Sequence, residues 1–119
     1  MTLVLALILA ISRPPSAYIA APSGHVPLAI SSWCWGPKHR CGAPIAASVK
    51  TAKLNRNATV HLELAFVPSA VTVTILGHPA KATVSGHEIS WKATRAGGLT
   101  VRAAGSGGWV IYVGKLALK

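Results

Sequence analysis

Acidic residues are almost absent from this chain of 119 residues, which contains no aspartate and only two glutamates, Glu63 and Glu88. Against them stand 12 Lys and Arg, so the formal net charge is +10 at pH 7. A paired-carboxylate acid/base site could be built only from these two glutamates. A Ser-His-Asp triad lacks its aspartate. The composition therefore argues against catalysis, and we expect a protein that is not an enzyme and has no cofactor.

Charged residues of both signs make up only 12% of the chain, whereas 51% of the residues are hydrophobic. A disordered polyelectrolyte requires low hydrophobicity, so this class is excluded. The length excludes a large multi-domain enzyme. We expect one small folded domain.

The apolar run at residues 3–11 is nine residues long, too short to cross a bilayer as a helix. Pro14 and Pro15 follow it closely, and small residues come next, as is typical of a secretory signal peptide. We expect a signal segment at 1–21, with cleavage between 17 and 24, and a mature domain at 22–119. This predicts a protein that is secreted or held at the cell envelope. The alternatives are a buried first strand and an uncleaved anchor.

Only two cysteines are present, Cys34 and Cys41. In a secreted chain such a pair most simply forms one intrachain disulfide. A zinc site that adds His39 lacks the usual four ligands at close spacing, and a redox pair would have the Cys-x-x-Cys spacing. We therefore expect a structural bridge that orders the loop between the two cysteines.

Helical periodicity is lacking after residue 24, where the dominant period of apolar residues is two. Alternating segments separated by Gly- and Pro-containing turns lie at 26–33, 58–66, 70–76, 89–94, 99–104 and 109–113. Short alternating strands at this spacing predict an antiparallel sandwich or barrel. Residues 105–108, Gly-Ser-Gly-Gly, are expected to form a hairpin turn.

The same alternation places Trp91 and Trp109 in the core, and Trp33 and Trp35 on the face opposite Cys34. One of the latter two could stack on a sugar or on the disulfide, and we expect the structural role, packing on the disulfide. In the last strand the apolar positions change from odd to even after Gly114, which predicts a β-bulge at that glycine.

The order of these features resembles that of small secreted immunoglobulin-like domains of Gram-positive bacteria. The resemblance rests on Ser-Ser-Trp-Cys-Trp-Gly (31–36), on the alternating strands, and on the final hairpin into Trp-Val-Ile-Tyr-Val (109–113). It covers about residues 26–118 and implies an all-β, immunoglobulin-like antiparallel β-sandwich of about seven strands. It also implies export, and it brings no catalytic residues. The near-absence of acidic residues is a departure from that family.

The five histidines show no His-x-His or His-x-x-x-His pair, so we expect no metal site. The alternative is that His61 meets His78 or His87 across the fold and binds zinc or copper.

The excess of positive charge is the main functional signal, because a strongly cationic surface attracts polyanions. The expected partners are an anionic cell-wall polymer, a polysaccharide or lipid headgroups; no nucleic-acid motif is present. The candidate anion-binding residues are Lys38, Arg40, Lys50, Lys53, Arg56, Lys92 and Arg102.

We therefore expect a non-catalytic binding or adhesion module at the cell envelope. The competing hypothesis is a small secreted enzyme or metal-binding protein that uses Glu63 or Glu88 with nearby histidines. A weaker one is a cationic protein that disrupts membranes.

Overall fold

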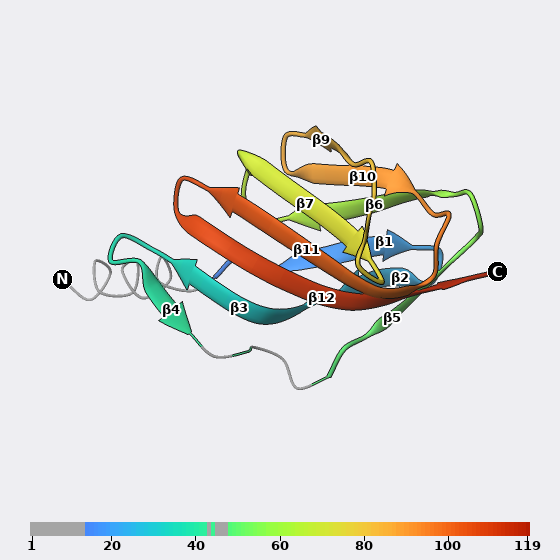
Figure 1. The fold of residues 1–119 in the computed structure, drawn as a ribbon, viewed down its shortest axis with the longest axis horizontal. Helices are drawn as coiled ribbons and strands as arrows, with labels where there is room; N and C mark the ends of the chain where they lie inside the picture. Colours follow the sequence, from blue (N-terminus) through green and yellow to red (C-terminus); the bar gives the residue numbers. More distant parts are fainter. Residues whose placement is uncertain (1–13, 43, 45–47) are drawn as a thin grey trace.

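The computed structural model describes residues 14–42, 44 and 48–119, which form twelve strands and no helix. Accordingly, no membrane-spanning helix is found in this part of the chain. The strands build two sheets that pack face to face, as Figure 1 shows from the side of β12. The predicted all-β sandwich is confirmed, and it contains more strands than expected because several pieces of two to four residues pair at the sheet edges.

The first sheet has five antiparallel strands. Their order across the sheet is β2 (Gly24–Pro27), β1 (Ala17–Ala21), β6 (Thr59–Leu64), β10 (Glu88–Lys92) and β9 (Thr83–Ser85).

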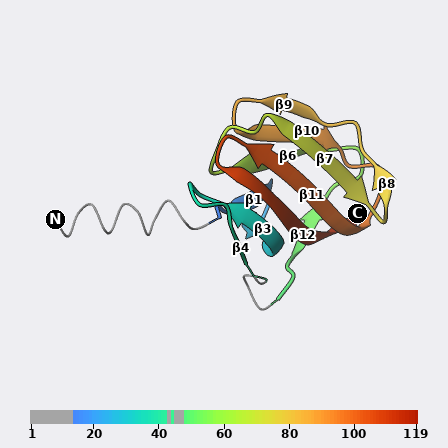
Figure 2. The same cartoon turned by 60° about the vertical axis from the view of Figure 1, so that its left-hand side comes forward.

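The second sheet has seven strands, and Figure 2 shows β4 and β8 at its opposite edges. Its order is β4 (Arg40–Gly42), β3 (Ala29–Trp35), β12 (Gly108–Leu118), β11 (Gly97–Gly105), β7 (Ala70–Ile75) and β8 (His78–Pro79). In addition, β5 (Thr51–Leu54) runs parallel to the end of β12.

The core lies between the two sheets and is built from alternate side chains of each strand, as half-buried strands require. From the five-stranded sheet, Ile19, Leu62 and Ile89 are fully buried. From the seven-stranded sheet, Val101 and Tyr112 are fully buried. The hydroxyl of Tyr112 donates a 2.7 Å hydrogen bond to the carbonyl of Pro15, which satisfies the one polar atom of that ring.

Of the four tryptophans, Trp109 differs from the expectation. Trp91 is buried in the core, as predicted. Trp109 is wrongly predicted: it is half-buried on the outer face of its sheet, opposite Cys34 in the register. Trp33 and Trp35 lie on the face opposite Cys34, as predicted, and both pack against the core.

The physical reason for the position of Trp109 is that inner and outer residues alternate without interruption along the whole of β12. Its even-numbered residues Val110, Tyr112 and Leu116 face the core, and its pairing with β11 continues through Gly114 without a shift. The predicted bulge at Gly114 is therefore wrong. Gly114 belongs to the inner row, where a Cβ atom would lie 2.6 Å from the side chain of Leu28.

An irregularity does occur on the other side of β12. The pairing with β3 shifts between Ile111, opposite Ser32, and Tyr112, opposite Ile30, which leaves Ser31 as an extra residue in β3. The hairpin predicted at 105–108 is confirmed, with Gly105 paired to Gly108.

The strand β1 falls inside the range assigned to the signal segment. It is hydrogen-bonded on one side to β2 and on the other to β6, and Ala17 and Ile19 are buried. The apolar run at 3–11 lies outside the described residues. Cleavage of the leader stays a prediction, but cleavage after residue 21 would remove an interior strand of the sheet.

We predict that a chain beginning at Pro14 folds as stably as the full chain, whereas one beginning at Pro22 does not. Loss of the buried Ile19 side chain alone removes about 1.5–3 kcal/mol of hydrophobic stabilisation. The total free energy of unfolding of a typical domain is only about 5–15 kcal/mol. Urea unfolding followed by circular dichroism measures the difference. Equal midpoints for the two truncated chains would contradict the placement of β1.

Candidate anion-binding surface

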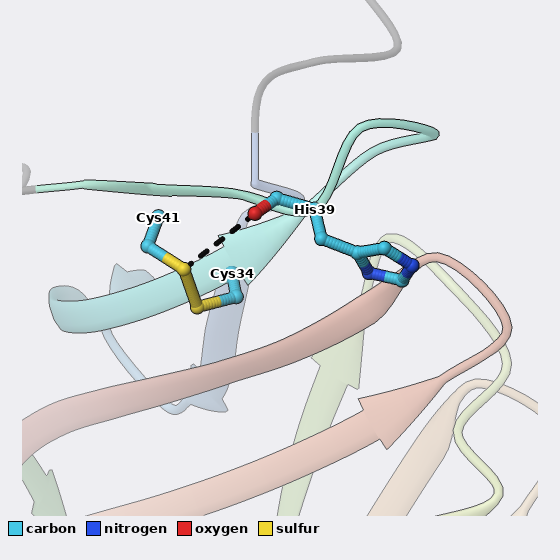
Figure 3. Close-up of a disulfide and its surroundings, with 3 residues drawn as sticks. All are labelled: Cys34, His39 and Cys41. Atoms are coloured by element: carbon cyan, nitrogen blue, oxygen red, sulfur yellow. Dashed lines mark hydrogen bonds between the residues drawn. A yellow bond between two sulfur atoms is a disulfide. The ribbon is translucent and has the colours of Figure 1, made fainter.

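The cysteines form a disulfide across the β3–β4 hairpin, where Cys34 and Cys41 are paired directly in the antiparallel register. Their Cα atoms are 4.0 Å apart, and Cys41 is exposed at the edge of the sheet. The Cys41 sulfur lies 3.6 Å from the carbonyl oxygen of His39. Figure 3 shows the two atoms side by side. The bridge thus closes the loop that carries Lys38 and Arg40.

The loop itself is a tight turn at residues 36–39. Gly36 has a φ of 93° and His39 one of 47°, both in the left-handed region that glycine adopts most readily. The backbone N–H of His39 donates to the carbonyl of Gly36 at 3.0 Å. This turn exposes Lys38, His39 and Arg40.

The outer face of the seven-stranded sheet carries aromatic and basic side chains together. The guanidinium of Arg102 lies over the indole of Trp109, 5.6 Å from the ring centre, a cation–π geometry. Farther along β12, Lys115 projects from the same face, and Lys53 of β5 lies opposite Ala117 on that face. All three basic residues are exposed.

Five basic residues come together where β5 runs beside the end of β12. The backbone N–H of Lys115 donates to the carbonyl of Lys50, and that of Arg56 donates to the carbonyl of Lys119. We call this group the basic cluster; its members are Lys50, Lys53, Arg56, Lys115 and Lys119. Like charges held together repel one another, so the cluster favours a bound anion.

The seven candidate residues from the sequence therefore divide into separate groups. Lys50, Lys53 and Arg56 lie in the basic cluster, Lys38 and Arg40 on the disulfide hairpin, and Arg102 on the sheet between them. Lys92 is apart from the rest, because it projects from β10 on the outer face of the five-stranded sheet.

Sequence reasoning did not include Lys115 and Lys119 among the candidates. They join the cluster only through the parallel pairing of β5 with β12, and that pairing has no local signal in the sequence.

Both glutamates lie on the outer face of the five-stranded sheet, opposite each other on β6 and β10. The hydroxyl of Tyr18 donates to Glu63, and Nδ1 of His61 lies 2.5 Å from Glu88 Oε1. The hydrogen bond to Glu63, then desolvation and the negative charge of Glu63, raise the pKa of Tyr18. The imidazole of His25 stacks on the Tyr18 ring, with ring centres 4.2 Å apart. Each carboxylate is thus engaged locally.

The consequence for the basic residues in the described part of the chain is that they have no acidic partner. Within the described ranges, the single ion pair is that between His61 and Glu88, and it exists only when the histidine is protonated. No described Lys or Arg forms a salt bridge.

The alternative in which His61 meets His78 or His87 is not observed, since His61 contacts Glu88 instead. Among residues 14–42, 44 and 48–119, no three His, Cys, Asp or Glu side chains are arranged to hold a metal ion. An open hollow beside β6 is lined by Leu64, Ala65, Phe66, Val67 and His87, and neither glutamate lines it.

Comparison of the chain with protein-family models, with curated proteins and with solved structures finds no match.

We predict that replacing both cysteines, in Cys34→Ala/Cys41→Ala, lowers the free energy of unfolding by about 2.5 kcal/mol, the chain-entropy value for a loop of this length. The effect is limited to this value because Cys41 is exposed and contributes little packing. Urea denaturation of the oxidised parent and the double variant measures it. A change below about 0.5 kcal/mol would mean that the bridge does not restrain the chain.

Proposed function

We propose that this domain is an exported, non-catalytic binding module that attaches to an anionic polymer or surface at the cell envelope. The observation that carries the proposal is the unneutralised charge: none of the described Lys and Arg residues has a carboxylate partner. A disulfide is compatible with an extracellular location. The immunoglobulin-like family inferred from the sequence agrees with this role and stays a prediction.

The arrangement of the charges supports binding along the length of β12. The basic cluster lies at one end of β12, Arg102 lies midway, and the disulfide hairpin lies at the other end. At ~3.3 Å per residue, the stretch of β12 from Gly108 to Lys115 is about 25 Å long. A linear polyanion is the partner that can contact basic groups spread over this length.

We predict that the protein is retained on immobilised polyanions at low salt and released as the salt concentration rises toward ~0.15 M, where the Debye length is only about 8 Å. The charge-reversal variant Lys53→Glu/Lys115→Glu should bind at least about tenfold more weakly, because each lysine near an anionic surface contributes roughly 1 kcal/mol. Titration in solution at several salt concentrations measures both effects.

The matched control is Lys81→Glu/Lys92→Glu, which changes the net charge equally at exposed positions away from the basic cluster. It should weaken binding far less. Retention that does not depend on salt, or equal loss in the two variants, would contradict binding at this face.

The second candidate, a small secreted enzyme or metal-binding protein that uses Glu63 and Glu88, is favoured by one observation. The two carboxylates lie opposite each other with His61 beside them. They lie on an exposed sheet face, and each already has a hydrogen-bonding partner, so we rank this candidate below the first. Isothermal titration with zinc distinguishes the two: heat of binding that disappears in Glu63→Gln/Glu88→Gln would favour the second candidate.

A further inference from the structure

A cleft opens between the tips of two hairpins at the end of the sandwich. One hairpin joins β3 to β4 and contains the disulfide, and the other joins β11 to β12. The backbone N–H of Gly36 donates to the carbonyl of Gly107 at 2.9 Å, which ties the tips together. The cleft has a volume of about 380 Å³ and is lined by Trp35, Gly36, Pro37, His39, Ser106 and Gly107. This volume is within the range of about 300–1,000 Å³ that is usual for small-molecule sites.

The aromatic wall of the cleft is held in place from behind. Trp35 is half-buried and meets the ring of Phe66 edge to face, with ring centres 4.9 Å apart. Gly107 lies so close to the indole that a Cβ atom there would be 2.6 Å from it. The neighbouring residue, Cys34, is fixed by the disulfide. Trp35 therefore presents a preorganised aromatic surface to the cleft.

The polar side chains that line the rest of the cleft are those of His39 and Ser106. Figure 3 shows the imidazole of His39 turned away from the disulfide and toward the β11–β12 hairpin, where Ser106 lies at the turn. Both side chains are exposed and can donate or accept hydrogen bonds. Lys38 and Arg40, on the same hairpin, are exposed and have no carboxylate partner.

This combination matches the chemistry of an acidic sugar. A pyranose ring has an apolar face of C–H groups, which suits an indole, and hydroxyl groups at its edge, which suit His39 and Ser106. A carboxylate on the ring is attracted by the positive charges of Lys38 and Arg40, which belong to the same hairpin without lining the cleft. A bare phosphate would make no use of the aromatic wall, and an acyl chain would leave the polar groups without partners.

We propose that this cleft binds one uronic-acid residue of a linear polysaccharide, with Trp35 under the sugar ring and His39 and Ser106 at its hydroxyl groups. The inference rests on the proposed function, because it assigns the chemical class of the anionic polymer.

The test compares three soluble probes of similar length: an oligomer of galacturonic acid, an uncharged oligomer of glucose, and polyphosphate. The full chain should bind the uronic-acid oligomer at least about tenfold more tightly than the glucose oligomer, a difference of ~1.4 kcal/mol. Ser106→Trp fills the cleft from an exposed turn position and should weaken binding of the uronic-acid oligomer by at least about tenfold, while polyphosphate binding stays within about twofold.

Two further variants make the test specific. Ser85→Trp places the same side chain on an exposed position of β9, in the other sheet, and should change nothing. His39→Asn removes the imidazole with a residue that tolerates the left-handed backbone at this position, and should weaken binding of the uronic-acid oligomer alone. Thermal unfolding of each variant verifies that it is folded.

The outcomes separate the two proposals. If Ser106→Trp and His39→Asn bind the uronic-acid oligomer as the parent does, the cleft assignment is overturned, while binding of polyanions by charge stands. If polyphosphate and the uronic-acid oligomer bind equally tightly and the cleft variants have no effect, the cleft assignment is likewise overturned, and binding of polyanions by charge stands. If the parent binds no charged probe, the proposed function fails, and the cleft assignment fails with it.

Discussion

Burial of one row of side chains along β12 is the constraint on which the rest of the molecule depends. Val110, Tyr112 and Leu116 face the core, and at the same time β12 pairs with β11, β3 and β5. A shift of one residue would turn this whole row toward solvent and bring Trp109 and Ile111 inside. The row therefore fixes which side chains of the seven-stranded sheet are available to a partner.

The functional surface follows from this constraint. With the even positions of β12 inside, Trp109 lies on the outer face under Arg102, and Lys115 lies beside β5 with the other residues of the basic cluster. The two glutamates, which could have neutralised some of this charge, lie on the opposite sheet and contact Tyr18 and His61. Because both carboxylates lie on the other sheet, the outer face of the seven-stranded sheet is left cationic. A cationic face whose Lys and Arg residues have no carboxylate partner within the described residues is suited to binding a polyanion.

Much of the architecture could be predicted from local patterns. Apolar and polar residues alternate clearly along residues 58–66 and 70–76, and this pattern depends only on neighbouring residues. Both segments contain strands, and the predicted apolar side chains face the core. The Gly-rich hairpin at 105–108 and the cysteine pair also depend on residues that are close in the sequence. In the last strand the pattern was ambiguous, because Trp109, Ile111 and Val113 are as apolar as the residues that are buried. Only packing against Leu28 and the other sheet decides between the two faces.

The candidate site was harder to predict because its parts are distant in the sequence. Lys50 and Lys115 meet through a parallel strand pairing, and Trp35 meets Ser106 through the contact of two hairpins. The strand β1 was assigned to the signal segment since it follows the apolar run directly, and nothing local marks it as part of the sheet.

Titration of Tyr112 tests the central claim most directly. The chain has only two tyrosines, so Tyr18→Phe leaves Tyr112 as the sole phenol. Burial raises the pKa of Tyr112 well above its ordinary value near 10. Because the fold favours the neutral phenol, the stability that this contributes is complete below pH ~10 and is lost as the pH rises beyond it.

We predict that the absorbance of tyrosinate appears only together with loss of the β-sheet signal in circular dichroism, at a pH clearly above 10. Ionisation near pH 10 with the β-sheet signal intact would contradict the account, because Tyr112 would then be in contact with water.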